Sequence, residues 1–220
     1  MTAPLRLSID LEHDRSRAVE LLANGGVLAV PTDTVYGVAA SLSSPAAIET
    51  IYQLKGRPKD KPLPVLVADP TDASTLSGPL DPRIIRFLER AWPGAVTVIL
   101  PAASDLPMAV LGLTSSGETT VGLRVPDHTG LRALIRALGS PIATTSANRS
   151  GDAPALTADE AESAFLASTG VALAAVLAGS TRSSGRASVV FDVTGSPPKV
   201  LRQGPDADRI LALWHETVDG

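Results

Sequence analysis

The sequence contains no cysteine, and this absence excludes several kinds of site together. A chain without thiols forms no disulfide bond, no thiolate nucleophile and no cysteine-ligated metal site. Proteins of the reducing cytoplasm rarely use disulfides, so we expect a cytoplasmic protein. Aromatic residues are also scarce, at 3% against 44% for all hydrophobic residues. The core is therefore expected to consist mainly of Ala, Val, Leu and Ile side chains.

Long apolar runs and familiar catalytic motifs are absent as well. No segment is long and uncharged enough to cross a bilayer, and the first residues, MTAPLRLSID, lack the apolar run of a signal peptide, so we expect no membrane partner. There is no Walker A motif, no G-x-G-x-x-G, no H-E-x-x-H and no G-x-S-x-G. Three histidines, His13, His128 and His215, are scattered, so we expect surface residues and no metal site.

The spacing of apolar, capping and turn residues predicts one α/β domain in these 220 residues. Helices are expected at 15–23, 46–54, 82–90, 131–138, 157–167 and 207–216. Strands are expected at 27–30, 63–69, 95–100, 119–125, 141–145, 171–177, 188–193 and 200–203. This mixed order favours an open, partly antiparallel sheet over a barrel. Two segments rich in Ser, Gly and Thr, 102–118 and 179–187, are expected to be either mobile lids or surface loops.

Positive charge is concentrated in one loop. The formal net charge is −4, yet three of the four lysines lie in the stretch KGRPKDK at 55–61. Prolines within and after the stretch stiffen it, which lowers the entropy lost when Lys55, Arg57 and Lys61 converge on one anion. A triphosphate fits that density of charge, because arginine binds phosphate in a bidentate manner and lysine acts as a point charge. The alternative is an ordinary solvated basic loop.

Two further polar loops adjoin predicted strands. PTDTVYG at 31–37 carries hydroxyl and carboxylate groups that suit a small polar molecule, and TTSANRSG at 144–151 offers the Ser146 hydroxyl and the Asn148 amide. Ligands of open α/β sheets bind where such loops gather at strand ends, so one shared pocket is predicted. A strand-end turn and an ordinary turn before a helix remain the alternatives.

Taken together, six motifs resemble the YrdC-like family of threonylcarbamoyl-AMP synthases. They are PTDTVYG at 31–37, KGRPKDKPL at 55–63, WPGAVTVIL at 92–100, VGLRVPDH at 121–128, PIATTSANRSG at 141–151 and LRQG at 201–204. The resemblance implies a twisted, open, mixed α/β sheet with flanking helices and a concave basic cleft. It also implies a short, single-domain form, with a catalytic domain at 1–205 and a C-terminal helix at 206–220 packed on it.

The family's activity would make this chain a nucleotidyltransferase. It would join L-threonine, bicarbonate or CO2, and ATP carrying Mg2+ into threonylcarbamoyl-AMP, with release of pyrophosphate. The product serves threonylcarbamoyladenosine formation on tRNA, so tRNA and the downstream transfer proteins are expected partners.

The resemblance also assigns site residues. By motif, Lys55 and Arg57 would be catalytic, and the cationic clamp would offset charge on the triphosphate. The ATP-binding residues would be Arg57, Lys61, Thr120, Ser146, Asn148 and Ser188. The threonine-binding residues would be Thr34, Arg124, Leu66 and Thr144, with no metal-ligating side chain.

Two stretches depart from the family pattern. Leu66 stands where many members have histidine, and LAGS at 177–180 replaces a run that usually includes an acid. SVVFD at 188–192 likewise departs from the usual STVVD. The competing interpretation is a paralogue that binds RNA or nucleotide without synthase activity. A carbamoyl-transfer module of hydrogenase maturation is disfavoured, because the chain lacks zinc-finger and acylphosphatase-like segments.

Overall fold

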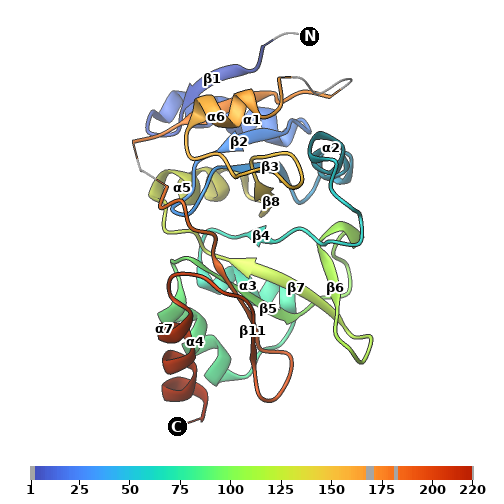
Figure 1. Ribbon diagram of the computed structural model, residues 1–220, viewed down its shortest axis with the longest axis vertical. Helices are drawn as coiled ribbons and strands as arrows, with labels where there is room; N and C mark the ends of the chain where they lie inside the picture. Colours follow the sequence, from blue (N-terminus) through green and yellow to red (C-terminus); the bar gives the residue numbers. More distant parts are fainter. Residues whose placement is uncertain (1–2, 167–170, 181–182, 220) are drawn as a thin grey trace.

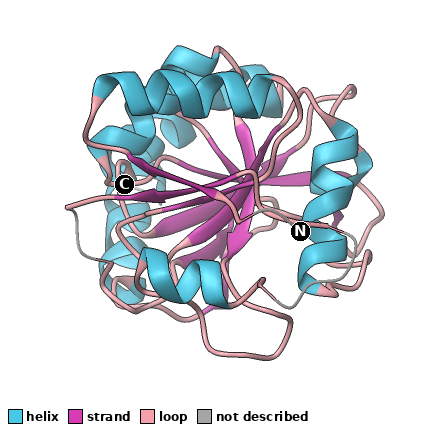
Figure 2. Cartoon of the chain, turned by 90° about the horizontal axis from the view of Figure 1, so that it is seen from above, coloured by secondary structure: helices cyan, strands magenta, loops and turns pink. Residues whose placement is uncertain are grey.

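Eleven strands form one mixed sheet in the computed structural model, which describes residues 3–166, 171–180 and 183–219. The strand order is β1-β9-β2-β3-β8-β4-β7-β5-β10-β11, and β6 pairs with β7 outside this path. In Figure 1 the strands follow one another along the long axis of the molecule, and the view along that axis in Figure 2 shows them crossing at successive angles. The strands are β1 (Leu5–Ser8), β2 (Leu28–Val30), β3 (Gly37–Ser41), β4 (Val65–Leu66), β5 (Val96–Pro101), β6 (Leu111–Leu113), β7 (Thr119–Arg124), β8 (Ile142–Ser146), β9 (Ala175–Ala178), β10 (Val189–Asp192) and β11 (Lys199–Arg202).

Helices cover both faces of the sheet. One face packs on α1 and α5, and the opposite face packs on α2, α3, α4, α6 and α7. The helices are α1 (Glu12–Ala23), α2 (Pro45–Lys55), α3 (Ala73–Ser77), α4 (Pro82–Ala91), α5 (Thr129–Leu138), α6 (Ala158–Ser163) and α7 (Ala207–Trp214), with short helical turns at Pro70–Asp72, Met108–Val110 and His215–Asp219. None of the helices in the described ranges is both long and apolar enough to cross a membrane.

The C-terminal helix is fixed by an aromatic cluster. Phe87 of α4, Phe191 of β10 and Trp214 of α7 have ring centroids 5.3 to 5.7 Å apart, in tilted or edge-to-face orientations. All three are buried, and such contacts add to the gain from apolar burial. Three of the few aromatic residues of the chain thus pack α7 against α4 and the sheet.

Alternation along the strands creates a cleft on one face. On β7, Val121 and Leu123 point into the large apolar cluster, whereas Thr120, Gly122 and Arg124 line the cleft on the other side. Strands β5 and β10 alternate in the same way. Because successive side chains of a strand point to opposite faces, a sequence of alternating apolar and polar residues builds a core and a binding surface together.

The prediction of a twisted, open, mixed sheet with flanking helices is confirmed. Several element boundaries were wrong. The predicted strand at 63–69 shrinks to β4, and the predicted strand at 171–177 is replaced by β9. Residue 167, the predicted end of the helix at 157–167, lies outside the described residues. Short elements β1, β3, β6 and α3 were missed. Strand β3, GVAAS, has small residues buried on both faces, so it lacks the alternation that marks a half-exposed strand.

Candidate functional site

The cleft has a volume of about 1080 Å³ and is lined by residues of β3, β4, β5, β6, β7, β8, β10 and β11. It gathers residues from all three polar loops that the sequence singled out. Nine of the predicted site residues line it: Thr34, Arg57, Leu66, Thr120, Arg124, Thr144, Ser146, Asn148 and Ser188. The lining does not include the other two, Lys55 and Lys61.

Arg124, at the end of β7, forms a buried ion pair with Asp33. Its Nη2 donates to both carboxylate oxygens, at 2.6 and 2.7 Å. Its Nη1 donates to Thr34 Oγ1 at 2.9 Å, and its Nε donates to the carbonyl oxygen of Gly94 at 2.9 Å. Burial lowers the pKa of Arg124 and the Asp33 charge opposes that shift, so the guanidinium remains charged. The structure thus brings Thr34 and Arg124 together and adds Asp33, the carboxylate of the loop at 31–37, which had no specific role from sequence.

The turn that carries these residues is held by the Thr32 side chain. Its hydroxyl donates to the carbonyl oxygen of Val35 at 2.6 Å and accepts from the backbone N–H groups of Thr34 and Val35. The N–H group of Ser184 donates to the carbonyl oxygen of Asp33 at 2.9 Å. The sequence PTDT therefore folds back on itself, and a distant part of the chain fixes it against the cleft.

Lys55 ends α2 and turns away from the cleft. Its Nζ donates to the carbonyl oxygen of Ser146 at 2.5 Å and to the carbonyl oxygen and Oδ1 of Asn148 at 2.6 and 3.0 Å. The residue is only 3% exposed. Burial, together with the positive charge of Arg57, lowers the pKa of Lys55 to about 8, so the side chain is mostly protonated at pH 7. Lys55 therefore holds the loop at 146–148 in place.

The predicted convergence of three cations on one anion is not found. Arg57 lines the cleft, with Nε donating to the carbonyl oxygen of Lys61 at 3.1 Å and Nη2 to that of Pro62 at 3.1 Å. Lys61 contributes its backbone to this arrangement. Lys59 lines the cleft instead, and its Nζ pairs with Glu49 at 2.8 Å. The sequence located the basic loop, but the path of its backbone decides which charges face inward.

Arg202 is a cleft residue that the sequence assignment missed. Its Nε donates to the carbonyl oxygen of Ser188 at 2.9 Å, and its Nη2 donates to Ser188 Oγ at 2.9 Å. Ser188 Oγ is also hydrogen-bonded to Thr97 Oγ1 at 3.1 Å. Burial lowers the pKa of Arg202, and the positive charges of Arg124 and Arg57 lower it further. Arg202 is part of the LRQG motif at 201–204, to which the family resemblance assigned no role.

Two glycines allow threonine side chains to stand close to the neighbouring backbone. A Cβ atom on Gly37 would lie 2.8 Å from Thr144 Oγ1, and one on Gly112 would lie 2.8 Å from Thr120 Oγ1. Both threonines line the cleft, as does Leu66, which is 2% exposed. The floor of the cleft therefore combines hydroxyl groups with an apolar patch.

His128 is buried, at 2% exposure, which corrects the prediction of a surface histidine. Its Nδ1 accepts a hydrogen bond from the backbone N–H of Leu131 at 3.2 Å and caps α5. Burial lowers the pKa of His128, so the neutral form is favoured. A histidine N-cap replaces the usual Ser or Asp here, which is why the sequence pattern did not reveal it.

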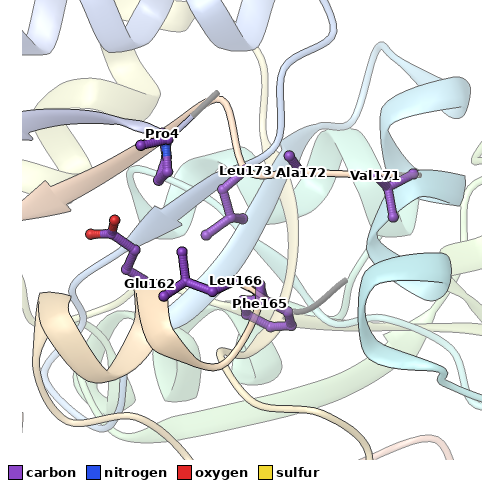
Figure 3. Close-up of a pocket in the computed structure, with 8 residues that line it drawn as sticks. Pro4, Glu162, Phe165, Leu166, Val171, Ala172 and Leu173 are labelled. Carbon is purple, nitrogen blue, oxygen red and sulfur yellow. The ribbon is translucent and has the colours of Figure 1, made fainter. Parts of the chain in front are cut away.

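A second, smaller hollow of about 160 Å³ lies between the N-terminal segment and α6 (Figure 3). Its lining is mostly apolar, including Phe165, Leu166 and Leu173. The one charged side chain of this lining, Glu162, pairs with Arg6. A hollow of this size and lining lacks the groups that bind a nucleotide or an amino acid, so the large cleft is the candidate site.

Comparison with known proteins identifies the family of this chain. The sequence profile of the Sua5/YciO/YrdC family, described as "Telomere recombination", matches residues 20–204. The chain is similar to threonylcarbamoyl-AMP synthases from Bacillus subtilis, at 43% identity over 62% of this chain and 38% of that protein, and from Thiobacillus denitrificans, at 38% identity over 66% of this chain and 74% of that protein. The match spans only about half the length of the threonylcarbamoyl-AMP synthases from Mus musculus and Pyrococcus abyssi.

Among solved structures, the fold is similar to that of Sua5 from Pyrococcus abyssi complexed with L-threonine. The TM-score is 0.82 at 28% sequence identity, over 96% of this chain and 61% of that one. The profile match covers most of the chain and includes all three polar loops that form the cleft. This chain therefore belongs to the Sua5/YciO/YrdC family.

Proposed function

We propose that this protein is an L-threonylcarbamoyladenylate synthase, a nucleotidyltransferase that forms threonylcarbamoyl-AMP and pyrophosphate from L-threonine, bicarbonate or CO2, and ATP. The observation that carries the proposal is the composition of the large cleft. The Thr34–Arg124 pair lies in the same cavity of about 1080 Å³ as Arg57, Arg202 and the loop at 146–148. That volume is enough for an amino acid and a nucleotide side by side.

The nucleotide half of the cleft would be formed by neutral polar groups and two arginines. Ser146 Oγ donates to Asn148 Oδ1 at 2.6 Å, which orients both side chains at the cleft surface. Arg57 and Arg202 supply charge-assisted hydrogen bonds of the kind that phosphate oxygens accept best. In this arrangement Lys55 acts as a positioning residue for the loop and does not touch the phosphates.

The amino acid half would use Arg124 for the carboxylate and Thr34 for a polar group of threonine. Thr144 and Leu66 lie close by, so one further hydroxyl and one apolar side chain are available for the methyl-bearing end of the substrate. Because leucine has no polar side-chain atom, discrimination by hydrogen bonding would rest on Thr34 and Arg124.

The chemistry needs no protein nucleophile. The amino group of threonine attacks CO2 and releases a proton, which gives a carbamate. A carbamate oxygen then attacks the α-phosphorus of ATP, the bond between this phosphorus and the β-bridging oxygen breaks, and pyrophosphate leaves with the bonding electrons. Fixed guanidinium groups stabilise the charge that builds up on the phosphate oxygens.

Magnesium would enter with ATP. The described residues contain no group of three or more His, Cys, Asp or Glu side chains placed to hold a metal ion, and Mg2+ is commonly bound through substrate phosphates with few protein ligands. The product would then pass to the proteins that modify tRNA.

Pyrophosphate release tests the proposal directly. Purified protein is incubated with ATP and Mg2+, and threonine or bicarbonate is omitted in turn. We expect release that depends on both, together with formation of threonylcarbamoyl-AMP detected by mass spectrometry. Binding of ATP without any threonine-dependent product would instead support the nucleotide- or RNA-binding interpretation.

A further inference from the structure

The three arginines of the cleft differ in how their charge is compensated. Arg124 has a carboxylate partner in Asp33, with both oxygens within 2.7 Å of Nη2. In the described part of the chain, the polar contacts of Arg57 and Arg202 are to neutral oxygens. Arg57 contacts backbone carbonyls and the phenol of Tyr52, and Arg202 contacts the carbonyl and hydroxyl of Ser188. One arginine is thus neutralised within the fold, and two are not.

This contrast matches the charges of the two proposed substrates. Threonine is a zwitterion with no net charge, whereas a triphosphate carries several negative charges. All three guanidinium groups bind phosphate well in principle, because the geometry of the group suits carboxylate and phosphate alike. The arginines also lie near enough for Arg124 and Arg57 to lower the pKa of Arg202. If nothing reduced the positive charge at Arg124, a polyphosphate would therefore compete with threonine for binding there.

We propose that Asp33 is a specificity-determining residue: its carboxylate keeps the Arg124 position electrically neutral, so that polyphosphate is confined to Arg57 and Arg202 and the amino acid retains its own position. This inference rests on the proposed function. Asp33 itself is not part of the cleft lining, so it acts through Arg124 and is a positioning residue rather than a catalytic one.

The other carboxylates of the cleft do not perform this task. Asp60 and Asp152 are exposed, and Asp192 accepts hydrogen bonds from the backbone N–H and hydroxyl of Thr194. Within the described ranges, Asp33 is the carboxylate that forms an ion pair with an arginine of the cleft lining. Its side chain is only 17% exposed. Because water screens a buried pair little, its loss changes the local potential more than the loss of an exposed carboxylate does.

The test measures binding of inorganic pyrophosphate and L-threonine by isothermal titration calorimetry to the full chain. In the wild type, we expect saturating threonine to change the Kd of pyrophosphate by less than threefold. Asp33→Asn should bind pyrophosphate at least tenfold more tightly, and threonine should then weaken that binding. The gain should shrink as salt is added. Asp69→Asn is the matched control, because Asp69 pairs with Arg132 and Arg136 away from the cleft.

Each outcome bears on the inference. Competition between pyrophosphate and threonine in the wild type would overturn it even if Asp33→Asn failed to fold. Unchanged pyrophosphate affinity in folded Asp33→Asn would overturn it as well. Asp33→Glu keeps the charge and should retain the wild-type pattern. A wild-type protein that bound neither ATP nor threonine would overturn the proposed function together with the inference.

Discussion

Replacing Lys55 by methionine removes a buried ammonium group while roughly keeping the length of the side chain. The wild-type Nζ serves three oxygen acceptors in the loop at 146–148. Methionine has no N–H group to donate, so the carbonyl oxygens of Ser146 and Asn148 lose this hydrogen-bond donor. We expect the loop to lose its fixed position relative to α2, and the nucleotide half of the cleft to lose order with it.

The size of the effect follows from two opposing contributions. Each buried polar group left without a partner costs about 1–3 kcal/mol. Part of this cost is offset because methionine requires no desolvation of a charge, which is the main cause of the lowered pKa of Lys55. We therefore expect the free energy of unfolding at pH 7 to fall by about 2 kcal/mol.

The difference between the two proteins should depend on pH. The folded-state pKa of Lys55 is about 8, below the ordinary value of 10.5, so the folded protein releases this proton before the unfolded chain does. Between these values the unfolded state binds more protons, and the stability of the wild type relative to Lys55→Met rises with pH. The rise is at most about 3 kcal/mol and is absent below about pH 7.

Urea unfolding followed by fluorescence measures this difference, since Trp92 and Trp214 are both buried. Lys199→Met is the control, because Lys199 is an exposed lysine. ATP titration should show weaker binding for Lys55→Met, with threonine binding little changed. A stability difference that stayed constant from pH 7 to 10 would refute the burial argument, and unchanged ATP affinity would refute the positioning role.

Four other substitutions test the division of the cleft. Arg57→Ala and Arg202→Ala should each lose about 2–4 kcal/mol of transition-state stabilisation while remaining folded; near-normal pyrophosphate release in both would contradict the phosphate assignment. Thr34→Val should reduce the discrimination of threonine from 2-aminobutyrate in a competition assay, because the site then lacks the hydroxyl that pairs with the substrate. Leu66→Ala should loosen packing with a smaller effect on discrimination, and the reverse order of these two effects would place the threonine pocket elsewhere.

The general architecture and the content of the cleft could be predicted from the sequence. Alternation in strands such as β7 marks which residues face the core, and the polar loops at strand ends mark where a ligand binds. Nine of eleven assigned residues line the cleft for this reason. Capping at Thr157 was also predictable, and its hydroxyl accepts from the N–H of Glu160 at 3.2 Å.

The sequence did not determine the partner of each charged group. Lys55 and Arg57 are two positions apart, and from sequence alone both are cations of the same basic stretch. In the structure Lys55 is buried against the loop at 146–148, whereas Arg57 lines the cleft. Asp33 and Arg124 are far apart in the chain, and only the meeting of the turn after β2 with the end of β7 makes them an ion pair.

Local patterns therefore indicated most of the helices, the longer strands and the chemical types present at the site, because these depend on neighbours in the chain; the short strands β1, β3 and β6 lacked such a pattern. Tertiary structure decided which charges are compensated, which are buried and which remain available to a ligand. Those properties depend on distances between residues brought together from separate elements, and electrostatic energy varies steeply with distance and burial.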